Sequence, residues 1–354
     1  MRKIMKNDRK GKNSALQHHR KYCSSIRLLI AVSLFAGCTL FCACTRTEKP
    51  VAPPEKIIIA CATLPQTTLA QVAQTQGYYR EEGLEATVHL HSYGKHALQE
   101  VLDGKADVAT VAETPVMFAV MKGEQISILA TIHTSSLGHA VVARKDRGIN
   151  TFGDLKGKKI AATLGTSADF FLDAILLSNG ISRKDVVVVH RKAEEIPDAL
   201  AHGDIDAVST FTPYVELTQK KLGDRVITFN NREIYRNTFN IVATHEFILK
   251  NPEKVRKVLR ALVKAEEFVA GNTVEAQSIV ANFTGIDMPV VRAFWVNAKF
   301  IVSLDQSLIL ALEDESSWAI KNGLTEARKA HNFLDHIYIE GLKSVKPSAV
   351  RILK

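Results

Sequence analysis

The chain has 354 residues, is 46% hydrophobic and carries a formal net charge of +9. Nine Lys and Arg residues fall within the first 27 positions against the single acid Asp8, so this segment holds +8 of the net charge. The remainder is near neutral, which argues against a nucleic-acid partner.

An uncharged apolar run, LLIAVSLFAGCTLFCACT (28–45), follows the basic segment. This order, with small residues before a cleavage point, is typical of an export signal. LFAGC and LFCAC both resemble a lipobox, so we expect a lipoprotein-type signal over 1–43 and a lipid on Cys38 or Cys44. The Ala-Gly pair favours Cys38, whereas the polar tether that follows keeps Cys44 open. A plain transmembrane anchor is the alternative, because the run is about the shortest that spans a bilayer.

Either reading holds the body at a bacterial membrane, on the periplasmic or cell-surface side. Cys61 is the one cysteine of five that lies in this body. A single cysteine makes neither an internal disulfide nor a cysteine metal site. We therefore expect it to pack as a small apolar residue in a strand.

Strand and helix patterns alternate along the body, which begins after a tether at 44–55. We expect strands at 56–63, 84–91, 106–112 and 126–132, then at 158–164, 185–190, 206–210, 225–229 and 238–244, with helices in most of the intervals. Beyond residue 246 the pattern turns helical, with helices near 273–283, 288–299 and 305–322 that would pack Trp295 and Trp318 as core. Repeated strand–helix units imply an α/β fold with parallel sheets and helices on both faces.

The corner Gly165-Thr166-Ser167 joins an expected strand to an expected helix. The spacing of glycines before it fits neither a phosphate loop nor a dinucleotide fingerprint. A helix start has unpaired N–H groups that attract anions and polar ligand groups. Thr166 and Asp169 also fit a capping box, so a self-capped helix without a ligand is the alternative.

Ligands of open α/β sheets bind beyond the carboxyl ends of the strands. Those ends are rich in hydroxyl, amide and aromatic groups, which suits a small polar ligand in a cleft. They fall at 63–68 (with Gln66), 91–96, 113–114, 131–136, 165–167 and 210–214.

His89 and His91 share one strand face, and His96 lies nearby, so the two side chains could reach one metal ion. The alternative is a solvated strand face, and we assign no metal and no cofactor. The sequence has no Gly-x-Ser-x-Gly elbow, and HEFIL (245–249) lacks the second His of a zincin motif.

Several stretches resemble the periplasmic solute-binding proteins of the nitrate/sulfonate/taurine transporter group. They are GYYREEGL, LDGKADV, ETPVMFA, DLKGKKI followed by GTS, ALAHGDIDA and the Pro-Tyr at 213–214, in that order over about 56–245. The resemblance implies a type II binding-protein fold, with two α/β lobes joined by two strands that cross near Val141–Lys145 and Phe239–Thr244.

The resemblance also implies a domain organisation and a ligand site. The first lobe would comprise 56–142 and 245–340, the second 143–244, and residues 341–354 a tail. The implied cleft walls are Ser92, Gly94, Glu113, Thr114, Gly165, Thr166, Ser167, Thr210 and Tyr214. A separate membrane permease and its ATPase would be the partners of this ABC importer component.

The resemblance leaves the ligand open. Nitrate, taurine or an aliphatic sulfonate fits the group, but no arginine lies in the polar loops, and Tyr93, Phe211 and Tyr214 could stack on a flat ring. The superfamily includes binders of thiamine-type pyrimidines and a pyrimidine synthase with a cysteine-rich motif. Because the body has only Cys61, we expect a receptor rather than an enzyme.

Overall fold

The structure, a computed structural model, describes residues 53–353. The expected signal, most of the tether, and the candidate lipid sites Cys38 and Cys44 lie outside the described residues. No helix within 53–353 combines the length and the apolar character needed to cross a membrane.

Within this part of the chain the strands form two sheets. The seven-stranded sheet has the order β12-β11-β4-β10-β3-β1-β2, and the five-stranded sheet has the order β7-β6-β8-β5-β9. The strands of the first sheet are β1 (Glu55–Ala62), β2 (Leu84–His91), β3 (Val108–Ala112), β4 (Ile126–Ser135), β10 (Asn237–Thr244), β11 (Ala298–Asp305) and β12 (Val350–Arg351). Those of the second are β5 (His139–Arg144), β6 (Lys159–Ala162), β7 (Val187–His190), β8 (Ala207–Phe211) and β9 (Val226–Phe229).

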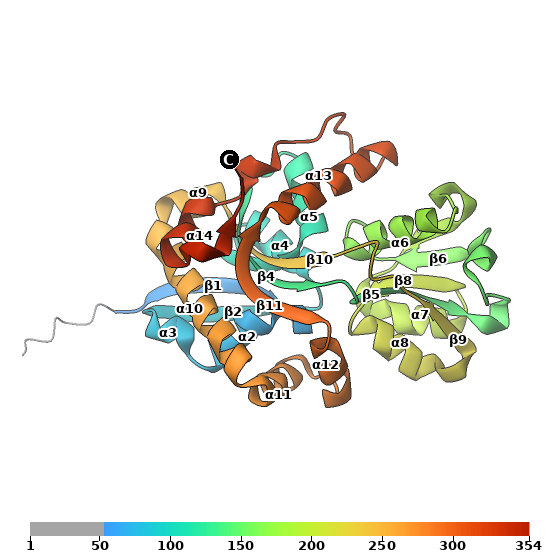
Figure 1. The fold of residues 1–354 in the computed structure, drawn as a ribbon, viewed down its shortest axis with the longest axis horizontal. Helices are drawn as coiled ribbons and strands as arrows, with labels where there is room; N and C mark the ends of the chain where they lie inside the picture. The colour runs from blue at the N-terminus through green and yellow to red at the C-terminus, as the bar shows by residue number, and fades with distance from the viewer. Residues whose placement is uncertain (1–52, 354) are drawn as a thin grey trace, which may run out of the picture. The chain divides into compact units, whose positions relative to one another are not determined.

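Helices cover both sheets and define two lobes (Figure 1). The first lobe carries α2 (Thr68–Thr75), α3 (Tyr78–Glu81), α4 (Gly94–Leu102), α5 (Glu113–Met121), α9 (His245–Lys250), α10 (Pro252–Gly271), α11 (Thr273–Thr284), α12 (Met288–Trp295), α13 (Gln306–Lys321) and α14 (Ile339–Val345). The second carries α6 (Ser167–Ser178), α7 (Ile196–His202) and α8 (Tyr214–Leu222). The expected α/β class and the two-lobed binding-protein architecture are therefore observed.

Strand β5 shows why the second sheet is covered on both faces. Its residues alternate between two cores, since successive strand side chains point to opposite faces. Val141 and Ala143 pack with the α6 residues Phe171 and Ile175. Ala140 and Val142 pack in a separate cluster with residues of α7 and α8.

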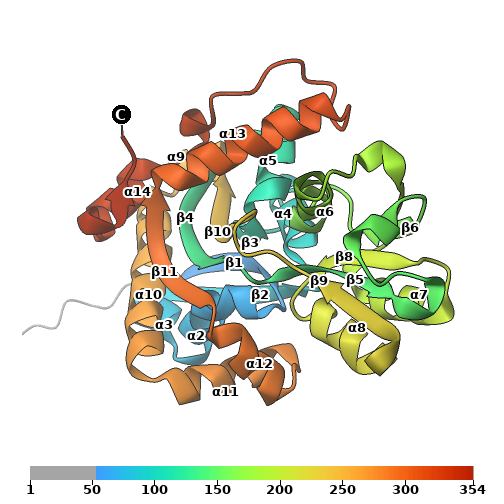
Figure 2. The ribbon, with the colours of Figure 1, turned by 45° about the vertical axis from the view of Figure 1, so that its right-hand side comes forward.

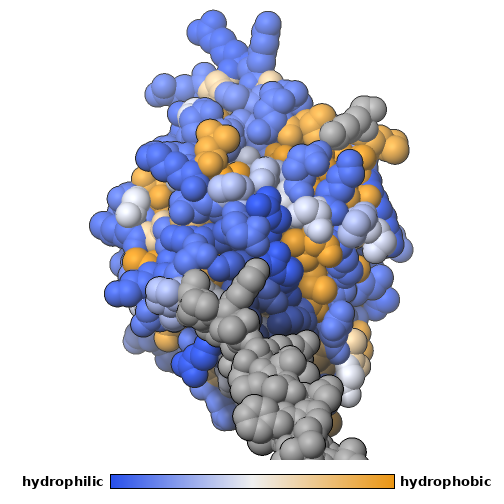
Figure 3. Space-filling view, turned by 90° about the vertical axis from the view of Figure 1, so that its left-hand side faces the viewer, coloured by the Kyte–Doolittle hydropathy of each residue, from blue (hydrophilic) through white to orange (hydrophobic). Residues whose placement is uncertain are grey.

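Helix α10 covers one side of the first lobe. Its apolar stripe, which includes Val258 and Leu262, is fully buried. Its opposite face carries charge: Arg260 pairs with Glu82 at 2.6 Å, and Lys264 pairs with Glu82 at 2.7 Å. The side of the molecule seen in Figure 3 is mainly hydrophilic, with hydrophobic residues scattered between hydrophilic ones.

The chain passes between the sheets at positions that differ from the expected ones. Strand β5 lies wholly in the second sheet and β10 wholly in the first, so the connecting segments are 136–138 and 230–236 rather than Val141–Lys145 and Phe239–Thr244. The sheets are also mixed rather than parallel. Strand β10 runs antiparallel to β3 and β4, and β5 runs antiparallel to β8 and β9, because these strands continue from the connections between lobes.

Two strands near the C-terminus were not expected. The sequence predicts a helix near 288–299, but α12 ends at Trp295 and β11 follows at Ala298, paired with β4. The alternation of Phe300, Val302 and Leu304 is the period of a strand. Residues 341–353 are not an appendage to the fold, because Val350 in β12 pairs with Leu304 in β11.

Candidate functional site

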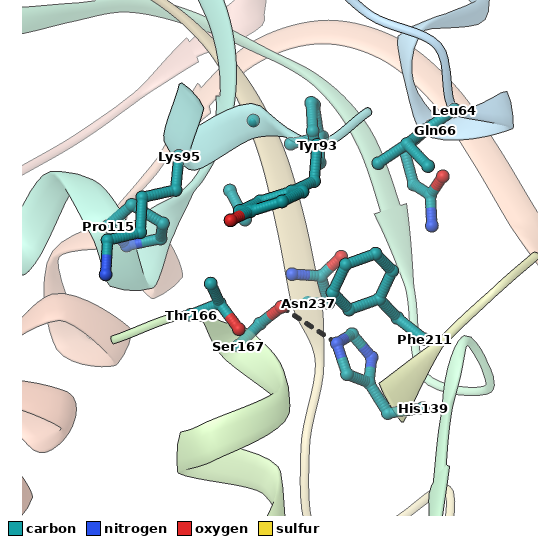
Figure 4. A pocket seen from close by; sticks show the side chains of 13 residues that line it. Leu64, Gln66, Tyr93, Lys95, Pro115, His139, Thr166, Ser167, Phe211 and Asn237 are labelled. Carbon is teal, nitrogen blue, oxygen red and sulfur yellow. Dashed lines mark hydrogen bonds between the residues drawn. The ribbon is translucent and has the colours of Figure 1, made fainter. Parts of the chain in front are cut away.

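A pocket lies between the two lobes and encloses about 340 Å³ of empty space, including its open mouth. Both lobes contribute to it, and Asn237, the first residue of β10, lies among the lining residues (Figure 4). The lining residues are Leu64, Gln66, Tyr93, Gly94, Lys95, Ala112, Pro115, His139, Thr166, Ser167, Phe211, Asn237 and Phe239.

Aromatic side chains form opposing walls of this pocket. Figure 4 shows the Tyr93 ring on the side of the first lobe and the Phe211 ring on the side of the second. The Tyr93 hydroxyl bonds the Nε2 atom of His96 at 2.8 Å, which fixes the ring. Gly94 opens α4 beside Phe239, and a Cβ there would lie 2.8 Å from the Val111 Cα. A glycine is therefore needed for this close approach.

Gln66 presents an unused acceptor. Its Nε2 atom donates to the Thr212 carbonyl at 3.1 Å, which orients the amide, because only the nitrogen can donate. The side-chain oxygen of Gln66 is buried and has no hydrogen-bond partner. A ligand N–H or O–H group would satisfy it.

Asn237 is oriented by a buried carboxylate behind the pocket. Its Nδ2 atom donates to both oxygens of Glu113, at 3.3 and 3.1 Å. Glu113 also accepts from the Tyr235 hydroxyl and, at 2.9 Å, from the Thr238 backbone N–H. Burial raises the pKa of Glu113. With Nδ2 occupied by these groups, the Asn237 carbonyl oxygen is the part of the amide left for a ligand.

The Gly165-Thr166-Ser167 corner is a capped helix start that also lines the pocket. Thr166 is the N-cap of α6 and accepts from the Ala168 N–H at 3.3 Å. The Asp169 carboxylate accepts from the Gly165 N–H at 2.9 Å, whereas a capping box would have used the Thr166 N–H. The backbone N–H groups of Thr166 and Ser167 have no partner in the described residues and remain available to an acceptor group.

His139 supplies an uncharged polar edge. Its Nε2 atom shares a hydrogen bond of 2.9 Å with the Ser167 hydroxyl, the contact drawn in Figure 4. Burial lowers the pKa of His139 to about 3, so the ring is neutral near pH 7. Its neighbours Phe171, Phe211 and Tyr235 make this environment apolar.

Lys95 marks the border of the pocket. Its ammonium donates to the Leu164 carbonyl at 2.8 Å, and burial followed by the charge of Lys122 lowers its pKa. Gly165 lies beyond this lysine, in an adjoining outer hollow. It has φ +71°, and a Cβ there would lie 2.8 Å from the Lys95 Nζ atom. A side chain at Gly165 would strain the loop with or without a ligand, so its substitution tests binding poorly.

Direct contacts bring the two lobes together around the pocket. Gln66 and Lys95 of the first lobe donate to backbone carbonyls of the second, as described above. The Tyr214 hydroxyl donates in the other direction, to the Ser92 carbonyl at 3.3 Å. The described conformation is therefore a closed one.

The residues expected at the site divide into three groups. Gln66, Gly94, Thr166 and Ser167 line the pocket, and Gly165 lines the adjoining hollow. Ser92 and Tyr214 join the lobes. Glu113, Thr114 and Thr210 are fully buried behind the lining: Glu113 holds Asn237, Thr114 donates to Glu315 at 3.0 Å, and the Thr210 hydroxyl has no partner.

Sequence reasoning missed three polar lining residues, Lys95, His139 and Asn237. Lys95 stands in the polar stretch SYGKH, directly after two of the expected residues, and that stretch was the available signal. His139 and Asn237 flank the connecting segments, so their place at the pocket follows only once those segments are located.

The three histidines considered for a metal do not converge. His89 and His91 both contact Glu100, at 3.0 and 3.2 Å, whereas His96 bonds Tyr93. Within residues 53–353 no group of three or more His, Cys, Asp or Glu side chains is arranged to hold a metal ion.

Residues 65–276 match the family described as NMT1/THI5 like, and the chain belongs to this family. It is similar to a binding protein of Brucella abortus, 25% identical over 67% of this chain and 74% of the relative. A Bacillus subtilis protein named for aliphatic sulfonate binding is 23% identical, over 70% and 75%. The 4-amino-5-hydroxymethyl-2-methylpyrimidine phosphate synthase THI5 of Saccharomyces cerevisiae is 27% identical, over 58% and 64%.

Solved structures share the fold. The periplasmic aliphatic sulphonate binding protein SsuA from Escherichia coli has a TM-score of 0.68 at 17% identity, over 80% of this chain and 98% of that one. The periplasmic nitrate-binding protein NrtA from Synechocystis has a TM-score of 0.67 at 12% identity, over 83% and 89%. At these identities the likeness establishes the periplasmic-binding-protein fold.

Proposed function

We propose that this protein is an extracytoplasmic solute receptor that binds one small organic molecule between its lobes and hands it unchanged to an ABC permease and its ATPase. The observation that carries this proposal is the pocket itself. Its polar groups come from both lobes, and the lobes are joined by two short segments. Such an arrangement closes on a ligand and opens to release it.

The polar groups of the pocket indicate which ligand it suits. The free N–H groups of Thr166 and Ser167 call for an acceptor or an anionic group, which the start of α6 favours further. The free carbonyl oxygens of Gln66 and Asn237 call for N–H donors. We therefore expect a polar molecule that carries both an acceptor group and N–H groups.

The aromatic walls favour a ligand that also contains a flat ring. Tyr93 and Phe211 offer faces for stacking, and His139, which contacts Phe211, is neutral. A heterocycle that carries amino and oxygen groups meets all these features. An aminosulfonate such as taurine is the second candidate, supported by its own donor and acceptor ends and by the sulfonate-binding relative.

The location of the protein follows from the leader. A lipid on Cys38 or Cys44 would hold the body on the outer side of a bacterial membrane, close to the permease. The periplasmic structural neighbours support this side of the membrane.

An enzyme that acts on such a molecule is the alternative, because the yeast relative is named as a synthase. The lone cysteine of the body does not supply a nucleophile. Cys61 is buried in β1 as expected, and burial raises its pKa to about 11, so the thiol stays protonated near pH 7. His139 is likewise a weak base, because burial lowers its pKa to about 3. These properties favour the receptor.

The test is to identify what the protein carries. Protein purified from its native membrane is denatured, and the released small molecules are compared by mass spectrometry with those from a Gln66→Leu variant. Gln219→Leu, which changes an amide of α8 outside the pocket, is the matched control. We expect one compound that is retained by the parent and the control and lost from Gln66→Leu. Equal recovery from all three would contradict a ligand in this pocket.

A further inference from the structure

A second pocket lies where strands of the first sheet meet the connections between lobes. It encloses about 790 Å³ of empty space, including its open mouth. Ser135, at the end of β4, pairs with Asn237 of β10 and also with Ala298 of β11, so three strand ends meet there. We call it the hinge pocket, because residues of both connecting segments line it, namely Ser136 and Leu137 from one and Arg232 and Arg236 from the other.

The hinge pocket is strongly basic. Arg232, Arg236 and Lys299 line it, and no acidic residue does so in the part of the chain that the structure describes. None of the three cationic side chains has a hydrogen bond or ion pair within residues 53–353. All three side chains are exposed, and their summed positive charge at one hollow would attract an anion.

Hydroxyl groups add to this cationic lining. Thr134, Ser135 and Ser136 lie at the same hollow, and their O–H groups can donate to an oxyanion. Arginine forks and hydroxyl donors together are typical of sites for phosphate groups. The hinge pocket and the ligand pocket thus differ in chemistry, since the ligand pocket is largely neutral and aromatic.

The two pockets use adjacent residues of one segment. Arg236 lines the hinge pocket, whereas its neighbour Asn237 lines the ligand pocket. Successive side chains of an extended chain point to opposite sides, which explains the separation. A group bound at the hinge pocket therefore occupies a different site from the ligand.

We propose that the hinge pocket is a binding site for an oxyanion of the phosphate type, held by Arg232, Arg236 and Lys299. Phosphate groups of this kind occur on free anions and on lipid headgroups. The site is independent of the transported ligand, so it can exist whether or not the proposed function is correct.

The test is calorimetric titration of the full chain with inorganic pyrophosphate at low salt. We expect saturable binding at one site, weakened at least tenfold in Arg232→Gln/Arg236→Gln and also weakened in Lys299→Gln, which lies on β11 rather than on a connecting segment. The control Arg328→Gln/Lys329→Gln removes the same charge from exposed residues after α13 and should bind like the parent. Pyrophosphate binding that is absent from the parent, or equal in the parent and all variants, would exclude a site for a free anion.

A second titration distinguishes the two sources of phosphate. Vesicles of phosphatidylglycerol in phosphatidylcholine replace pyrophosphate, with the same parent, variants and control. A loss confined to pyrophosphate assigns the hinge pocket to a free anion. A loss confined to the vesicles assigns it to a lipid headgroup. If the substitutions at Arg232, Arg236 and Lys299 matter in neither titration, the hinge pocket is not an anion site.

Discussion

The indole of Trp318 and the carboxylate of Asp173 join the two lobes outside the ligand pocket. The Trp318 Nε1 atom, on α13, donates to Asp173 on α6 at 2.7 Å, and the indole packs edge-on against Phe170 of α6. Figure 2 shows the two helices, α13 in the first lobe and α6 in the second. Asp173 also accepts from Arg183 at 2.8 Å, so its charge stays paired if the indole is lost. The contact therefore stabilises the closed arrangement without touching the ligand.

Replacement of this indole should weaken ligand binding at a distance. Trp318→Phe keeps an aromatic ring but removes a hydrogen bond to a carboxylate, which we set at about 1 kcal/mol because Trp318 is only half-buried. The dissociation constant should rise about fivefold, measured by calorimetry with the ligand recovered from the protein. Trp295→Phe is the control, since Trp295 packs against Phe300 within the first lobe. Equal effects of both substitutions, or of neither, would show that the contact does not govern closure.

Ser167 gives the most direct probe of the helix start at the pocket. Ser167→Ala removes a hydroxyl that contacts His139 and lines the pocket, and we expect binding to weaken by about 1.5 kcal/mol, roughly tenfold. Ser178→Ala, at the other end of α6, removes a hydroxyl that bonds only within and next to that helix. Calorimetry should show weaker ligand binding for Ser167→Ala alone. A Ser167→Ala protein that melts normally and binds like the parent would make this corner only a helix cap.

His133 should make the protein sensitive to acid. It is fully buried in β4 beside Phe294 and Phe300, and neither ring nitrogen has a partner. Burial lowers its pKa from 6.5 to about 3. Between these two pKa values His133 is protonated in the unfolded chain but neutral in the folded protein. The free energy of unfolding therefore falls as the pH falls below 6.5.

His133→Phe removes this proton uptake. At pH 8 the imidazole is neutral in both states and contributes no linkage, whereas at pH 5 the linkage costs the parent about 2 kcal/mol. Denaturant unfolding should therefore show the variant gaining that amount over the parent between pH 8 and pH 5. His202→Phe, at an exposed position in α7, is the control and should show no such gain. A constant difference between His133→Phe and the parent at both pH values would refute the prediction.

The leader predicts a lipid on one of two cysteines. Cells that express Cys38→Ser, Cys44→Ser or the double variant are fed labelled palmitate, and the label is followed on the purified chain. We expect one single variant and the double variant to lose the label. Label that persists in all three would exclude a lipoprotein with its lipid on either cysteine.

The sequence predicted those features that depend on local pattern. Thr166 and its neighbours were recognised because a strand, a glycine and a helix-capping residue follow one another, and the helix start is where they indicated. Glu113 shows the limit. Its place after a strand suggested a pocket wall, but it accepts hydrogen bonds from Tyr235 and Asn237, more than 120 positions away in the sequence. No local pattern reveals that the second connecting segment and the first residue of β10 supply those partners.

His139 and Asn237 illustrate the same point for the pocket itself. Both stand at the start of strands that continue from the connections between lobes. The sequence predicts a strand at 238–244, directly after Asn237, and the resemblance implies a crossing near Val141–Lys145, shortly after His139, but neither prediction tells which sheet the strand joins. The first connecting segment is 136–138 rather than the expected Val141–Lys145. His139 therefore belongs to the second lobe and not to the first. The hydrophobic period of a strand does not reveal which other strands it pairs with, and this pairing decides where such residues lie.

The central claim is that one molecule binds between the lobes and leaves unchanged. The most direct test strips the protein of its ligand, adds back one equivalent of the purified compound and follows heat by calorimetry. The compound is then released by denaturation and weighed by mass spectrometry. We predict one site per chain, a tenfold weaker site in Ser167→Ala, and recovery of the compound at its original mass. A compound recovered at a new mass, with no other protein present, would contradict the receptor and make this protein an enzyme.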